Sequence, residues 1–386
     1  MSRARKTIGY LLYVMLRQGL SLISCLIPKN KRKILFFSSP DYSDNAKYIY
    51  EKMIEMKLER HFQLIWAVHK PIEANCVLRG TPMYFYHILT AKYIIATHGI
   101  PYWKASNQIA IFTEHGLPFK ASGYLSRLPF EDRISLNLLS KRVDYILSTS
   151  QFHAILLSAI YRVDPARILI TGWPRQDGLF NEKSEQAAAK VSIYKKRYDK
   201  VILYAPTFRE SRRDDLSSTL LESNEFIRFL CANNILCAYK PHKNVDIGEL
   251  ESRTKDSSIL VLKDEDLSRE GLHLYDFLAV FDLIITDYSS IFYDAALLDI
   301  PVIFYMPDLQ HYRVERGFLF SPDRWLPGHI VESSSKMADK IEEVFRQDPH
   351  KERREFIRDL MFEVHRDCSR KVINRLFPVV TEDRQK

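Results

Sequence analysis

Short apolar runs alternate with amphipathic stretches along most of the chain. KILFF (33–37) has the composition of a buried strand, and NAKYIYEKMIEM (45–56) has apolar residues at helical spacing. Buried strands separated by helices are typical of a parallel sheet that is covered on both faces. For the first half of the chain, the pattern predicts strands at 33–37, 62–68, 92–97, 108–113, 144–149 and 167–171.

A polar stretch over residues 182–198 interrupts this alternation, which then resumes. The second series of predicted strands covers 200–206, 235–242, 258–262, 282–287 and 301–305. We therefore expect two doubly wound, Rossmann-like α/β domains, one over residues 33–180 and one over residues 181–386, with a last helix that can pack back on the first domain. Ligands of such sheets bind beyond the carboxyl ends of the strands, where the polar motifs of this chain fall.

The segment 1–32 follows a different pattern. Its apolar stretch 8–27 ends in Pro28 and a basic cluster, which disfavours a cleaved signal peptide. Arg17, near the middle, would cost a membrane-spanning helix roughly 2.5 kcal/mol. Polar residues recur every three or four positions, so an amphipathic helix in the plane of the membrane interface is favoured, with lipid phosphates bound by Arg3, Lys6, Arg17, Lys31, Arg32 and Lys33. The alternative is a helix that packs on the protein's own body.

The charge distribution supports membrane attachment. The formal net charge is +8, and the eight cations before Ile34 account for all of it. A nucleic-acid-binding protein would carry its basic patch on the folded domain, whereas this distribution suits an anionic membrane surface. The five cysteines include no CxxC pair, which favours a reducing cytoplasm. We expect a peripheral protein on the cytoplasmic face of the cell membrane, with no nucleic-acid partner.

ITDYSSIFYDAALLDIPVIFY (285–305) is the most specific segment. A predicted strand ends at Asp287, and Ser289 and Ser290 then open a helix. The N–H groups at a helix start can bind a phosphate, and the two hydroxyls would add hydrogen bonds. Asp294 lies about one helical turn further, on a similar face. The plainer alternative is N-capping of the helix by Asp and Ser.

Other polar residues also stand at the ends of predicted strands. His115 follows 108–113, His242 ends 235–242, and Thr207 and Arg209 follow 200–206. An imidazole suits proton transfer near neutral pH, and a guanidinium matches a phosphate. The structural alternative for His115 is a turn histidine bonded to the backbone, and for His242 it is a capped strand end. The sequence contains no GxGxxG, Walker or HExxH motif, so we expect no cofactor and no metal, and leave a small effect of Mg²⁺ open.

Six segments resemble, in the same order, the motifs of the CDP-glycerol glycerophosphotransferases, the family of teichoic acid primases and polymerases. ITDYSS, followed by Tyr293-Asp294 and IPVIFY, resembles the family's ITDYSS, Phe-Asp and KPVIFY. In the segment TEHGLPFK (113–120), Glu114 stands where the family has tryptophan and Leu117 where it has threonine. These two differences leave the contacts with the acceptor open. The other five segments are YSDNAKYIYEKM (42–53), TEHGLPFK (113–120), GWPRQD (172–177), LYAPTFRE (203–210) and YKPHKN (239–244).

The resemblance implies a GT-B-like fold, with residues 33–180 as the acceptor domain and residues 181–386 as the CDP-glycerol-binding domain. It also implies a definite reaction. Glycerol phosphate would pass from CDP-glycerol to a hydroxyl of a lipid-linked or polymeric cell-envelope acceptor, of the teichoic acid or capsule type, and CMP would leave. His115 is then the base that takes the hydroxyl proton, and His242 donates to the diphosphate as charge develops. The implied substrate-binding residues are Thr207, Arg209, Asp287, Ser289, Ser290, Asp294, Arg175, Asn45 and Lys120.

Several alternatives stay open. Enzymes that use CDP-ribitol share these motifs, and nucleotide-sugar glycosyltransferases share the fold, although their ExxxxE pattern is absent from 287–305. A non-catalytic membrane scaffold is a more remote alternative, which the presence of both histidines disfavours. The length resembles a primase or capsule-type enzyme more than a long-chain polymerase. The sequence indicates neither the acceptor nor the oligomeric state.

Overall fold

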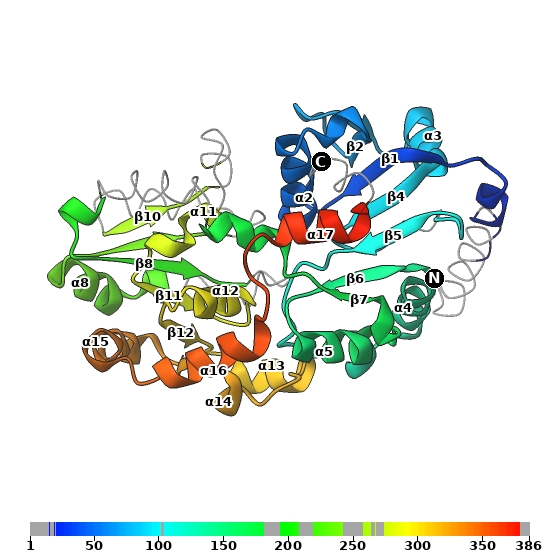
Figure 1. Ribbon diagram of the computed structural model, residues 1–386. Helices are drawn as coiled ribbons and strands as arrows, with labels where there is room; N and C mark the ends of the chain where they lie inside the picture. Colours follow the sequence, from blue (N-terminus) through cyan, green and yellow to red (C-terminus); the bar gives the residue numbers. More distant parts are fainter. Residues whose placement is uncertain are drawn as a thin grey trace. The chain divides into compact units, whose positions relative to one another are not determined.

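The computed structural model describes residues 15, 19, 21–101, 104–180, 194–207, 219–241, 258–263, 267 and 274–378. The chain divides into two compact units (Figure 1). The first unit combines the chain up to Gly116, Ser122–Asp177 and the chain from Glu363 onward. The second combines Leu117–Ala121 with Gly178–Phe362. Neither unit is therefore one continuous stretch.

The first unit is built on a seven-stranded parallel sheet in the order β3-β2-β1-β4-β5-β6-β7. Its strands are β1 (Asn30–Phe37), β2 (Gln63–Val68), β3 (Cys76–Leu78), β4 (Ala91–Ala96), β5 (Ile109–Phe112), β6 (Tyr145–Ser148) and β7 (Ile168–Ile170). Its α-helices are α2 (Asp44–Glu55), α3 (Pro82–Thr90), α4 (Phe130–Arg142), α5 (Gln151–Tyr161) and α17 (Cys368–Leu376), with 3₁₀ turns η1 (Leu58–Arg60), η2 (Gly123–Leu125) and η3 (Pro165–Arg167). A further 3₁₀ turn, η4 (Pro174–Phe180), begins in the first unit and ends in the second.

The second unit is built on a six-stranded parallel sheet in the order β10-β9-β8-β11-β12-β13. Its strands are β8 (Lys200–Ala205), β9 (Ile235–Tyr239), β10 (Ile259–Val261), β11 (Leu283–Thr286), β12 (Val302–Tyr305) and β13 (Gly328–Val331). Its helices are α7 (Thr219–Glu222), α8 (Asn224–Ala232), α11 (Leu274–Phe277), α12 (Ile291–Leu297), α13 (Leu309–Glu315), α14 (Pro322–Trp325), α15 (Met337–Gln347), α16 (Lys351–Met361) and the 3₁₀ turns η6 (Leu278–Val280) and η7 (Ser334–Lys336).

The expected α/β class with two parallel sheets is confirmed. Strands such as β6 and β11 are buried along nearly their whole length, as parallel strands covered on both faces must be. In each sheet the strand order reverses at one point, between β1 and β4 in the first and between β8 and β11 in the second. Such switch points leave a crevice at the carboxyl ends of the strands, where ligands of this class of fold bind.

The start of the first strand differs from expectation. β1 begins at Asn30 rather than at residue 33, so the basic cluster belongs to the sheet. Lys31 and Arg32 are exposed there, but Lys33 is buried, and its Nζ lies 2.8 Å from Thr90 Oγ1. Burial also lowers the pKa of Lys33. Its ammonium does not face the surface, and we drop Lys33 from the membrane-binding residues.

The predicted N-terminal helix falls mostly outside the described residues, as do Arg3, Lys6 and Arg17. Residues 21–25 are helical, and Ser21 Oγ donates to Lys104 O at 2.6 Å. Leu22, Ile23 and Leu26 expose more than half of their surface. In the part of the chain that is described, no helix has both the length and the apolar character needed to cross a bilayer.

The segment 117–121 belongs to the second unit although both its flanks belong to the first. Ala121 N donates to Gly317 O at 3.1 Å, and Leu319 N donates to Phe119 O at 2.9 Å. The Phe119 ring packs edge-on against Phe292, with centroids 5.6 Å apart. The segment is thus an added strand-like strap of the second unit, directly after Gly116.

The chain's last described helix completes the first unit. In Figure 1, α17 lies beside α2. Asp177 holds its start, because its two carboxylate oxygens accept from the backbone N–H groups of Cys368 and Ser369, both at 2.8 Å. A carboxylate at a helix N-terminus is favourable because the first N–H groups have no partner within the helix.

Gly172 is required by this docking. Its φ is +74°, and a Cβ there would collide with Cys368 Sγ and lie 2.7 Å from Val364 O. We expect Gly172→Ala to lower the melting temperature clearly more than Gly80→Ala. Gly80 has a similar φ of +85° but no atom within 4 Å of an added Cβ, so it reports the backbone strain alone, about 1–2 kcal/mol. Equal losses in the two variants would show that the contact with Cys368 is unimportant.

Two histidines of the second unit pack against each other. His350 Nε2 lies 3.4 Å from His329 Nδ1, and His329 Nε2 lies 3.4 Å from Glu343 Oε1. Burial, with the nearby His329 and Arg353, lowers the pKa of His350 to about 4, and burial also lowers the pKa of His329. Both imidazoles are therefore neutral in the folded protein at neutral pH.

This pair makes stability depend on pH. In the unfolded chain the pKa of a histidine is about 6.5, so the unfolded state binds the proton first as the pH falls. The stabilisation is complete above pH about 6.5 and is lost as the pH drops towards about 4. Between pH 7 and pH 5, we expect the melting temperature of the His350→Gln variant to fall less than that of the parent protein. An identical loss in both proteins would contradict the assignment.

Candidate active site

His115 lies in a tight turn that follows β5. Glu114 has a φ of +58°, a left-handed conformation that is uncommon outside glycine. The turn is held by Asn45, whose Nδ2 donates to the carbonyls of Thr113 at 3.0 Å and Glu114 at 2.9 Å. Asn45 is fully buried. A buried amide from α2 thus fixes the backbone on which His115 stands.

Arg175 holds the same turn from the other side. Its Nη1 donates to His115 O at 2.7 Å and lies 3.4 Å from Asp44 Oδ1, and its backbone N donates to Asn45 Oδ1 at 3.1 Å. Arg175 is 3% exposed. Burial raises the pKa of Asp44, and the guanidinium opposes that rise. The structure therefore gives Arg175 and Asn45 contacts that position the turn.

The His115 imidazole itself is accessible. Its side chain is 47% exposed, and its Nδ1 lies 3.2 Å from Thr97 O. A carbonyl oxygen only accepts hydrogen bonds, so Nδ1 carries the proton and Nε2 presents a lone pair. The His98 ring stacks on the His115 ring with centroids 4.0 Å apart. This is the arrangement that a general base needs.

A buried carboxylate stands beside His115. Glu114 Oε2 accepts from His115 N at 3.2 Å and lies 3.8 Å from His115 Nδ1, and its Oε1 accepts from the Tyr161 hydroxyl. Burial raises the pKa of Glu114, while His115 and Tyr161 oppose the rise. Burial and the neighbouring carboxylate raise the pKa of Tyr161 far above its usual range, so this hydroxyl keeps its proton.

Two other expected residues, Asp287 and Thr207, are in contact at the switch point of the second sheet. Asp287, after β11, accepts through Oδ1 from Thr207 N at 2.8 Å and from the Thr207 hydroxyl. The same oxygen accepts from Tyr288 N at 2.6 Å, and Asp287 is 2% exposed. Asp287 thus ties the ends of β8 and β11 together, and Thr207 stands half-buried at the edge.

At the start of α12 the two serines differ. Ser289 Oγ accepts from Ile291 N at 3.3 Å, whereas Ser290 makes no side-chain capping bond. Both residues are half-buried. Asp294 is fully buried, and its Oδ2 accepts from the Tyr275 hydroxyl at 3.4 Å. Ser289 thus caps the start of α12, while Asp294 is buried inside the unit.

The remaining expected residues are distributed as follows. Lys120 lies in the strap of the second unit, where it forms an isolated bridge with Phe318. His242 and Arg209 lie outside the described residues. No cluster of three or more His, Cys, Asp or Glu side chains that could hold a metal ion occurs among the residues that are described.

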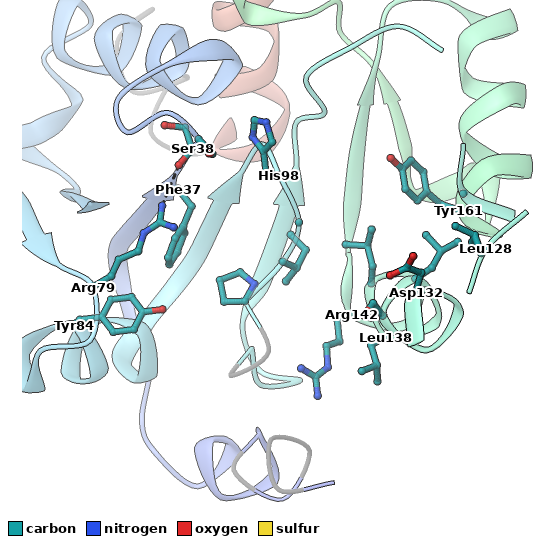
Figure 2. Close-up of a pocket in the computed structure, with 18 residues that line it drawn as sticks. Phe37, Ser38, Arg79, Tyr84, His98, Leu128, Asp132, Leu138, Arg142 and Tyr161 are labelled. Carbon is teal, nitrogen blue, oxygen red and sulfur yellow. Dashed lines mark hydrogen bonds between the residues drawn. The ribbon is translucent and has the colours of Figure 1, made fainter. Parts of the chain in front are cut away.

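A pocket of about 510 Å³ opens at the switch point of the first sheet (Figure 2). Ser38 and Ser39, after β1, and His98, after β4, line one part of it, and residues of α4 line another. None of these residues is among the site residues expected from the sequence. His98 follows the predicted strand 92–97, just as His115 follows the predicted strand 108–113. Its place at a strand end could therefore have marked it as a candidate site residue.

Comparison with known proteins finds relatives along most of the chain. The family model described as CDP-Glycerol:Poly(glycerophosphate) glycerophosphotransferase matches residues 20–378. A teichoic acid poly(glycerol phosphate) polymerase of Bacillus spizizenii is 25% identical over 91% of this chain and 93% of its own. A teichoic acid glycerol-phosphate transferase of Staphylococcus aureus is 29% identical over 82% of this chain and 84% of its own.

A solved structure of a variant of the wall teichoic acid polymerase TagF superposes with a TM-score of 0.77. The superposition covers 98% of this chain and 98% of the TagF chain, and the two sequences are 22% identical. At this identity the likeness concerns the fold, two Rossmann-like sheets of the GT-B kind.

Proposed function

Because the chain belongs to the CDP-glycerol:poly(glycerophosphate) glycerophosphotransferase family, we propose that the His115 turn is the catalytic centre at which it transfers glycerol phosphate to a cell-envelope acceptor. The donor is CDP-glycerol, and CMP is the leaving group. The observation that carries this assignment is the His115 imidazole, with Nδ1 on Thr97 O and the ring half exposed.

In the proposed reaction, His115 Nε2 takes the proton of an acceptor hydroxyl as that oxygen attacks the β-phosphorus of CDP-glycerol. A phosphodiester forms, the bond between the β-phosphorus and the bridging oxygen breaks, and CMP leaves with the electron pair. A positioned general base of this kind contributes about 10²- to 10⁴-fold to the rate. Thr97 O keeps the proton on Nδ1, so the imidazole has the correct tautomer before substrate arrives.

The second unit would hold the donor. Thr207 and Ser290 stand at its switch point, and Arg209 and His242 follow β8 and β9 in the sequence. Hydroxyl, guanidinium and imidazole donors are suited to the charge that develops on the diphosphate as CMP departs. Asp287 acts indirectly in this proposal, because its carboxylate fixes the Thr207 backbone and hydroxyl.

Attachment to an anionic membrane is part of the proposal. Leu22, Ile23 and Leu26 are exposed apolar side chains close in sequence to the exposed Lys31 and Arg32. Apolar burial combined with cations is the signature of interfacial binding. Vesicles with and without anionic lipid, sedimented with the protein, test this point. Equal recovery with neutral and anionic vesicles would contradict the role of the cations.

The experiment that tests the reaction uses purified protein, CDP-glycerol and a lipid-linked acceptor. We expect CMP release together with an acceptor that gains one or more glycerol phosphate units by mass spectrometry. CDP-ribitol in a parallel reaction tests the main alternative donor. Turnover with CDP-ribitol alone would reassign the donor, and the absence of CMP release with either would refute the enzymatic assignment.

A further inference from the structure

Glu114 is an unfavourable residue for its position in two respects. Its φ of +58° places a residue other than glycine in the left-handed region, and the residue is only 5% exposed. A buried carboxylate is unfavourable unless it is paired and hydrogen-bonded. Glu114 also stands where the segment 113–120 differs from the family motif. A residue that costs stability in the proposed catalytic turn is a candidate for a part in the reaction.

Two hydrogen-bond donors hold the Glu114 carboxylate against His115. Its Oε1 accepts from the Tyr161 hydroxyl, and its Oε2 accepts from His115 N at 3.2 Å. The same Oε2 lies 3.8 Å from His115 Nδ1. Burial raises the pKa of Glu114, and both His115 and Tyr161 oppose that rise. Both oxygens act as acceptors, which is the arrangement of an ionised carboxylate.

We propose that Glu114 is a positioning residue for the base, whose carboxylate balances the positive charge that His115 acquires on taking the proton of the acceptor hydroxyl; the inference rests on the proposed function. When that proton reaches Nε2, both ring nitrogens carry hydrogen and the ring becomes a cation. Oε2, at 3.8 Å from Nδ1, lies within the range of about 4–6 Å in which an opposite charge favours the charged form. Glu114 itself gains no proton in this step, and its burial keeps it from touching the substrates.

The other ionisable groups around the turn do not replace Glu114. Asp44, on α2, already has a cation beside it, because Arg175 Nη1 lies 3.4 Å from its Oδ1. Arg175 also donates to His115 O, on the backbone side of the turn. The His98 ring, stacked on His115 with centroids 4.0 Å apart, would oppose a charge on His115 if it were protonated itself. Among the described residues, Glu114 has no cation partner other than His115, so its charge is available to the protonated ring.

Glu114→Gln tests the proposal, with CDP-glycerol as donor and an oligomer of glycerol phosphate as acceptor. The amide keeps the size of the side chain and can still bond Tyr161 and His115 N, but it carries no charge. We expect kcat to fall by up to about tenfold, the rate equivalent of one pH unit. The acid side of the pH profile of kcat/KM should move about one unit lower, because the amide no longer favours the protonated ring. The KM for CDP-glycerol should stay unchanged.

Glu51→Gln is the matched control. Glu51 is also a glutamate of the first unit that accepts from a tyrosine hydroxyl, that of Tyr42 at 3.5 Å, but it pairs with Lys47 rather than with the His115 turn. This variant should keep the kcat and the pH profile of the parent protein.

Combining Glu114→Gln with His115→Ala separates a positioning role from a purely structural one. Without the imidazole there is no cation to balance, so Glu114→Gln should change neither the residual rate of the His115→Ala variant nor its pH dependence. A loss of rate that persists in this background, or a pH profile of Glu114→Gln like that of the parent, would overturn the positioning role and leave the proposed function standing. A His115→Ala variant as active as the parent would instead refute the base itself, and both proposals with it.

Discussion

Replacing His115 with alanine is expected to lower the rate of glycerol phosphate transfer by about 10²- to 10⁴-fold, the usual contribution of a general base. The turn should keep its fold without the imidazole, because Asn45 and Arg175 hold it through the backbone carbonyls of Thr113, Glu114 and His115. CDP-glycerol should therefore still bind the variant. CMP release and calorimetric titration with CDP-glycerol measure the two effects separately.

His69→Ala is the matched control for this variant. His69 is also a surface histidine of the first unit, with a side chain 65% exposed, and it pairs with Asp41 rather than with the His115 turn. It should keep full activity. If His115→Ala were as active as His69→Ala, the base would have to be another group.

Asn45→Ala is expected to cost both stability and turnover. The side chain donates to Thr113 O and Glu114 O and accepts from Arg175 N, all in the interior. Leaving a buried polar group without a partner costs about 1–3 kcal/mol, and three groups lose one here, so the free energy of unfolding should fall by at least roughly 3 kcal/mol. The His115 backbone would lose its support, and kcat should fall while the KM for CDP-glycerol changes little.

This variant also separates two roles for Asn45. The family resemblance implies a substrate contact, whereas the structure shows a buried amide that positions the turn. A raised KM with an unchanged melting temperature would favour the substrate contact. Asn137→Ala, exposed on α4, should alter neither quantity and serves as the control.

The sequence pattern predicted most of the two sheets because buried parallel strands form continuous apolar runs. Eleven predicted strands correspond to β1, β2 and β4–β12. The pattern missed β3 and β13, which are short edge strands: CVL (76–78) is only half buried, and GHIV (328–331) begins with two residues that are not apolar. The other two edge strands, β7 and β10, are also short and were predicted, so an edge position alone does not hide a strand from the pattern.

The chemistry of the site was less accessible from the sequence. His115 could be chosen because it follows a strand, but the burial of Asn45 and Arg175 depends on how α2, the β5 turn and the 172–177 segment meet. The pairing of Glu114 with Tyr161 joins residues 47 positions apart and has no sequence signature. Likewise, nothing in the order of residues indicates that the strap 117–121 leaves the unit that surrounds it.

The interleaved chain path limits how this enzyme can be divided. A gene fragment that stops at Asp177 would lack α17, whose first amides that carboxylate binds. A fragment that starts at Gly178 would lack Phe119 and its contact with Phe292. Producing either half as an isolated protein therefore requires a circular permutation or a supplied peptide, and any gene fusion that exchanges one unit between relatives must carry all of that unit's pieces together.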